Sequence, residues 1–89
     1  MNIENTVYKI DLTSKNIPDK NKAHQRMQGK ECVIHFLEKG LPLRGIYEYE
    51  KGRLKLFCTS DVIDIIEKED GNIFVETKNT FYRFKKLEN

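Results

Sequence analysis

Tight-turn dipeptides punctuate the second half of the chain, and they limit its possible folds more than any other feature. Between residues 43 and 87, short runs of β-branched and aromatic residues are separated by Lys51-Gly52, Asp70-Gly71 and Lys78-Asn79. Dipeptides of this kind between such runs are among the strongest short-range signals for β-hairpins. The pattern therefore predicts an antiparallel β protein.

Two earlier segments extend the predicted sheet. Residues 6–12 alternate in character, which predicts a half-buried strand with its Tyr8 face turned inward. Residues 31–38 are apolar almost throughout, as is typical of a strand covered on both faces. From the alternation along the strands we expect the core to include Ile34, Phe36, Leu56, Val75 and Phe84.

Residues 59–67 allow two interpretations. A helix capped by Ser60 would place several β-branched residues on one stripe. The density of these residues and the Asp70-Gly71 turn that follows favour a strand instead. The chain should then form about five to seven short strands. We expect a small antiparallel barrel of SH3-like or OB-like kind, or a strongly bent sheet.

Residues 13–30 form a long polar connection between the first two predicted strands. We expect a short helix over residues 19–28, with Ala23 and Met27 one turn apart and Gly29 as its stop. No apolar periodicity holds the rest of the connection to the sheet, so it is predicted to be mobile and to contact a partner.

Charge is concentrated in this connection. Residues 15–30, here called the basic segment, contain a single acid, Asp19, beside Lys15, Lys20, Lys22, Arg26 and Lys30. A local excess of this size steers a protein toward an acidic surface or a phosphate backbone. The whole chain carries a net charge of only +2, which by itself does not indicate a nucleic-acid partner.

Length and composition indicate one small domain over residues 1–89. The apolar runs are far shorter than the roughly 20 residues that a membrane-spanning helix needs, so no membrane association is expected. The first five residues show neither the basic nor the apolar region of a signal peptide. We therefore expect a cytoplasmic protein.

Candidate catalytic and metal-binding groups are few. Cys32 and Cys58 lie in apolar segments, which predicts buried free thiols rather than a disulfide. His35 with either cysteine is the only conceivable nucleophile pair, and a strand histidine without a catalytic role is the commoner case. Asp61 and Asp64 are more often turn or surface residues than a carboxylate pair. The sequence predicts no metal, no cofactor and no enzyme activity.

Aromatic residues beside cations suggest a binding surface. Tyr47 and Tyr49 lie on a predicted strand near several basic residues, and small barrels use this combination to stack bases. A domain of this size also needs most of its aromatic side chains in the core. Both interpretations stay open for these two tyrosines, which join the basic segment as candidate binding residues.

The last third of the chain contains the pattern Thr59-Ser60-x-Val62 followed by Thr77-x-Asn79-Thr80-x-Tyr82-x-Phe84. This pattern resembles small uncharacterised β-barrel proteins of bacteriophages and other mobile elements. The resemblance implies that the two threonines flank a turn, that Tyr82 and Phe84 fill the core, and that the protein is of phage origin. Phage proteins of this size often bind a host macromolecule, some as inhibitors of host defence nucleases in the manner of anti-CRISPR proteins.

Two functions are therefore expected as alternatives. The first is a non-catalytic binding module that docks on a host protein or nucleoprotein complex and inhibits a defence nuclease. The second is a small barrel that binds nucleic acid directly. Steep weakening by salt would distinguish the second.

Overall fold

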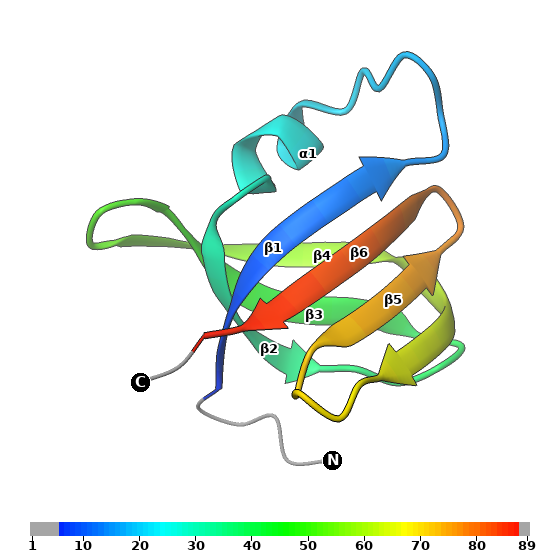
Figure 1. Cartoon of the computed structure of the whole chain (residues 1–89). Helices are drawn as coiled ribbons and strands as arrows, with labels where there is room; N and C mark the ends of the chain where they lie inside the picture. The colour runs from blue at the N-terminus through cyan, green and yellow to red at the C-terminus, as the bar shows by residue number, and fades with distance from the viewer. Residues whose placement is uncertain (1–5, 88–89) are drawn as a thin grey trace.

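The computed structural model describes residues 6–87, which form six strands and one short helix. The strands close into an antiparallel barrel in which every strand pairs with its neighbour in sequence (Figure 1). In chain order the elements are β1 (Val7–Ser14), α1 (Lys22–Met27), β2 (Glu31–Phe36), β3 (Pro42–Glu50), β4 (Arg53–Glu67), β5 (Ile73–Thr77) and β6 (Thr80–Lys86). The predicted barrel with one short helix is confirmed. The residues on which the signal-peptide argument rested lie outside the described range.

The first and last strands close the barrel. Strand β1 pairs with β2 through Val7 opposite Val33, and with β6 through Ile10 opposite Phe84. The amide of Leu87 also donates to the Val7 carbonyl at 3.0 Å. Closure leaves no open sheet edge between these strands to pair with another chain.

The predicted turns join the strands as expected. Gly52 and Gly71 adopt φ angles of 79° and 90°, which side chains with a Cβ atom rarely adopt. Residues 59–67, for which a helix was the alternative, belong to the long strand β4. The hairpin between β3 and β4 extends sideways beyond the barrel in Figure 1.

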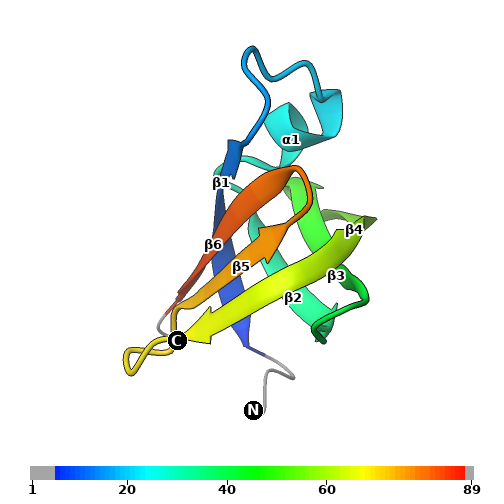
Figure 2. The same cartoon turned by 90° about the vertical axis from the view of Figure 1, so that its right-hand side faces the viewer.

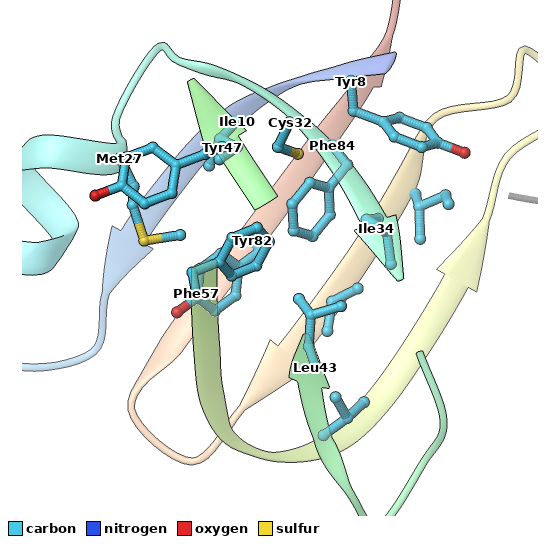
Figure 3. Close-up of a cluster of buried hydrophobic side chains, with 13 residues drawn as sticks. Tyr8, Ile10, Met27, Cys32, Ile34, Leu43, Tyr47, Phe57, Tyr82 and Phe84 are labelled. Atoms are coloured by element: carbon cyan, nitrogen blue, oxygen red, sulfur yellow. The ribbon is translucent and has the colours of Figure 1, made fainter. Parts of the chain in front are cut away.

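The core lies inside the barrel and is rich in aromatic side chains (Figure 3). Phe84 is fully buried, and its ring stacks on that of Tyr82 with centroids 5.8 Å apart. Thr77 and Thr80 flank the turn between β5 and β6, and the Thr77 hydroxyl donates to the Thr80 carbonyl at 3.2 Å. The structural roles that the resemblance implied for these four residues are therefore confirmed.

Helix α1 and the loop before it lie over one end of the barrel (Figures 1 and 2). The helix is shorter than predicted, because the Asn21 side chain accepts a hydrogen bond from the Ala23 amide and so caps it from there. Met27 is buried and lies beside Tyr47 in the core (Figure 3).

Two of the predicted core residues are on the surface. Ile34, Val75 and Phe84 are buried as expected, whereas Phe36 is 40% and Leu56 is 74% exposed. A bulge between Ile34 and Phe36 changes the phase of β2, so that Leu37 packs against the core instead of Phe36.

The alternation of β4 was assigned to the wrong face. Phe57 points into the barrel opposite Gly45, so Leu56 and Cys58 on either side of it point outward. The prediction that both thiols are buried is correct for Cys32 and wrong for Cys58.

Candidate functional site

The basic segment is held to the barrel by a buried histidine. His24 on α1 is 7% exposed, and its Nδ1 lies 3.0 Å from a carboxylate oxygen of Asp19. Its Nε2 lies 3.1 Å from the Thr80 hydroxyl at the start of β6. The ring also packs edge-on against Tyr82. These contacts, here called the His24 clamp, join the segment to a turn far along the chain.

A second set of contacts fixes the end of the segment. The side chain of Gln28 accepts a hydrogen bond from the Leu12 amide at 2.8 Å and donates one to Asp11 at 2.7 Å. The Ile10 amide donates a hydrogen bond to the Lys30 carbonyl, and the Gly29 amide donates one to the Ile10 carbonyl, each at 2.8 Å. The segment therefore has polar anchors to the barrel, which its lack of apolar periodicity does not indicate.

The clamp also orders the loop before the helix. Asp19 accepts a hydrogen bond from the Asn21 amide at 3.0 Å as well as the contact from His24. The Asn21 amide, and after it His24, hold the pKa of the Asp19 carboxyl below its usual value. The only acid of the basic segment is therefore an ionised group with its partners already in place.

The five predicted cations have different surroundings. Lys15 forms an ion pair with Glu76 and lies over the Phe81 ring, with its Nζ 4.7 Å from the centroid. Lys30 is half-buried beside β1. Lys20, Lys22 and Arg26 are exposed and form no ion pair with another part of the described chain.

The exposed part of the segment combines charge with an apolar side chain. Lys22 and Arg26 lie one helical turn apart, so they share one face of α1. Ile17, in the loop before the helix, is 95% exposed. We call Ile17, Lys20, Lys22 and Arg26 the basic tip.

The two candidate tyrosines lie on the core side of β3. Tyr47 is 3% exposed, and its ring lies 6.2 Å from that of Phe57. Tyr49 is half-buried and packs against Tyr47 at 6.5 Å. The core interpretation therefore holds for Tyr47, and Tyr49 offers only part of its ring to the surface.

Asp19, His24 and Thr80 stand in the order of an acid, a base and a nucleophile. Thr80 is only 1% exposed, however, and with His24 it lines a hollow of about 150 Å³. In this structure the three side chains join the loop, helix α1 and β6, and so act as a structural clamp.

Among the described residues no hydrogen bond joins Cys32, Cys58 or His35 to one another, although Cys32 and His35 line the same groove. Burial raises the pKa of the Cys32 thiol to about 12, which makes it a poor nucleophile. The exposed Cys58 sulfur contacts the Thr59 carbonyl, and Asp64 pairs with Lys39 at 3.5 Å. Within residues 6–87, no three metal-ligating side chains come together.

An apolar row, half-buried on β1, β2 and β3 and exposed on β4, crosses the outside of the barrel and was not predicted. Val7, Val33, Ile46 and Leu56 lie opposite one another on β1, β2, β3 and β4. Leu54, the next outward residue on β4, is 64% exposed and lines a groove of about 310 Å³ beside the row. We call these five residues the apolar row. The correct phase of β4 would have revealed it.

A second hollow of about 230 Å³ lies on the outside of β4, β5, β6 and β1. Phe74 and Phe81 line it together with three carboxylates, those of Asp11, Asp64 and Glu76. Each carboxylate has a cation within 4 Å, so this face carries little unbalanced charge. The carboxylates make it a poor surface for a phosphate backbone.

Comparisons with protein-family models, with curated proteins and with solved structures found no match for this chain. In the part of the chain that the structure describes, no helix has the length and apolar character needed to cross a membrane.

Proposed function

We propose that this protein is a non-catalytic binding module whose basic tip docks on an acidic surface of a partner protein or nucleoprotein complex. The observation that carries this proposal is the fixed position of unpaired charge. Lys20, Lys22 and Arg26 have no acidic partner among residues 6–87, while the His24 clamp holds their segment on the barrel. A preorganised charged surface loses little conformational entropy when it binds.

The composition of the tip favours a protein over a bare nucleic acid. Ile17, three positions before Lys20 in the loop, is almost completely exposed, and an isolated apolar side chain gains free energy only against another apolar surface. A phosphate backbone offers no such surface. The partner that fits is an acidic protein face with an apolar depression.

The resemblance of the last third of the chain to phage proteins supports a more specific proposal. In this proposal the partner is a host protein or nucleoprotein complex in the cytoplasm, and docking inhibits a defence nuclease. An acidic face that normally binds nucleic-acid-handling factors would suit the basic tip.

Direct binding of nucleic acid is the second candidate, and the same three unpaired cations favour it. The two candidates differ in how binding depends on salt. Release of counterions from a nucleic acid makes affinity fall steeply with ionic strength, whereas docking on a protein with an apolar contact weakens less.

The test removes the charge of the tip. Lys20, Lys22 and Arg26 are changed together to Ser, and binding is measured against nuclease-treated host lysate and against single- and double-stranded oligonucleotides. We expect the wild type to capture a partner protein from the lysate and the triple variant to capture none of it. We also expect the wild type to bind oligonucleotides only weakly at physiological salt.

A matched control removes the same charge elsewhere. Lys51, Lys55 and Lys78 are exposed and form no ion pair with other described residues. Changing all three to Ser gives this control the same net charge as the tip variant. This control should bind like the wild type. Equal loss in both triple variants would contradict a specific role for the tip, and retention of the partner by the tip variant would exclude it.

A further inference from the structure

The apolar row is an unusual feature for the outside of a small barrel. Outward residues of an antiparallel sheet normally face water and alternate with the core as polar side chains. Here Val33, Ile46 and Leu56 form an unbroken cross-strand row, with Leu56 74% exposed. Apolar side chains gathered in this way mark a surface that another protein surface covers.

The charges that flank this row have a specific arrangement. On β3, Arg44 precedes Ile46 by two residues and Glu48 follows it by two, so all three side chains point outward. One side of the row therefore carries a cation and the other an anion. Within the described chain neither side chain has an ion-pair partner, and Glu48 accepts only the Gly52 amide at 3.2 Å.

The neighbouring strand strengthens the asymmetry. Because Cys32 lies opposite Tyr47, Glu31 on β2 lies on the same side of the row as Glu48. The other side carries no acid on β2 or β3 at this level, only His35 and Arg44. On β2 and β3 the face is thus acidic on one side of Ile46 and basic on the other, while on β1 the exposed Lys9 lies opposite Glu31.

We propose that this face is the interface of a homodimer in which β3 of one copy crosses β3 of a second copy in the antiparallel direction at Ile46. The two-fold axis runs along the row, across the strands, so the acidic side of one copy faces the basic side of the other. Ile46 then meets Ile46 of the second copy, and Arg44 meets Glu48 twice. Such an interface is isologous, with each contact repeated by symmetry.

The charge pattern selects both this occupant and this orientation. An axis along the strands would place acid against acid, which costs free energy, whereas the axis along the row pairs opposite charges. The face around Phe74 does not have this property, because Arg83 pairs with Asp11 and Lys15 with Glu76 inside one copy. The apolar row is therefore the described surface whose unpaired charges complement a second copy.

The first experiment tests the row by sedimentation of the full chain over a range of concentrations. Changing Leu54 and Leu56 together to Ser should raise the dimer dissociation constant by about tenfold or more. Both side chains are exposed in one copy, so the fold and its circular dichroism should not change. The matched control changes Ile63 and Ile66, which are 49% and 48% exposed on the same strand, and should dimerise like the wild type.

The second experiment tests the orientation by charge reversal. Arg44→Glu and Glu48→Arg should each raise the dissociation constant by about fivefold to tenfold, and the double variant should return it close to the wild-type value. Since the basic tip lies elsewhere, its triple Ser variant should dimerise normally, which separates this proposal from the proposed function.

Three results would overturn the dimer. The first is a wild type that stays monomeric at about millimolar concentration, where even weak dimers form. The second is a double charge-reversal variant whose dimer dissociation constant is no lower than those of the single variants. The third is a dissociation constant raised as much by the Ile63 and Ile66 control as by the Leu54 and Leu56 variant, which would place the interface on another face.

Discussion

Gly45 and Phe57 face each other across β3 and β4, and the ring of Phe57 occupies the space that a side chain on residue 45 would need. A Cβ atom on Gly45 would lie 2.8 Å from this ring and 2.5 Å from the Val33 carbonyl oxygen. The single glycine of β3 is therefore what allows an aromatic ring to fill the barrel at this level.

Gly45→Ala should consequently destabilise the barrel by about 1–3 kcal/mol, because the added methyl group overpacks a core with no room for it. Urea denaturation measures the change. Phe57→Leu in the same chain should relieve only part of the loss, since the contact with the Val33 carbonyl remains. Full stability of Gly45→Ala would show that β2 and β3 can separate without cost.

Two phenylalanines give a matched test of the revised core. Phe84→Ala should cost about 3–5 kcal/mol, because the ring is fully buried and its removal leaves a cavity. Phe36→Ala should cost only about 1 kcal/mol, because 40% of that side chain is already in water. Thermal or chemical unfolding of both variants checks the order, and a larger loss for Phe36 would contradict the position of the β2 bulge.

The His24 clamp predicts a stability effect at the barrel end. His24→Ala removes the partner of the buried Thr80 hydroxyl and should cost about 1–3 kcal/mol. Thr80→Val in the His24→Ala background removes the stranded hydroxyl as well and should recover part of the loss. Amide exchange of residues 19–28 should accelerate in the His24 variant.

The same clamp predicts how acid acts on the loop. The pKa of Asp19 is lower in the folded chain than its ordinary value of 3.8, so its contacts stabilise the fold above that pH. This contribution is lost as the pH falls below 3.8 and the carboxyl becomes protonated. Asp19→Asn should therefore show a smaller loss of stability than the wild type between pH 4 and pH 2, as measured by unfolding at each pH.

The two thiols should differ sharply in reactivity. The pKa of about 12 at Cys32 leaves almost no thiolate near pH 8, and burial also blocks access to the sulfur. Cys58 is exposed and should react with a thiol reagent in the native protein, whereas Cys32 should react only after denaturation. Mass spectrometry of singly labelled protein identifies the site, and rapid labelling of Cys32 would contradict the closed barrel.

The strands and turns could be predicted because their signals are local. The dipeptide at Gly71 and the alternation around Tyr8 depend on neighbouring residues only, and the structure confirms both. The wrong assignments at Phe36 and Leu56 have a common cause. One bulge or one large aromatic residue decides which of two alternating sets points inward, and alternation alone cannot tell the sets apart.

The anchors of the basic segment could not be predicted for a different reason. His24 and Thr80 are separated by 56 positions in the sequence, and neither has a neighbour that signals the contact. Their hydrogen bond exists only because closure of the barrel brings α1 to the β5–β6 turn. The apolar row was similarly hidden, because Leu54 and Leu56 looked like core residues until Phe57 was placed.

The pairing of β1 with β6 also has a consequence for how the chain acquires its structure during synthesis. Ile10 and Phe84 are opposite each other in the finished barrel, yet almost the entire sequence separates them. Contacts of such long range form slowly, because the loop that they close is large. A growing polypeptide cannot complete this barrel until β6 has left the ribosome. Before then, β1 has only its short pairing with β2, and its inward face stays open to chaperones.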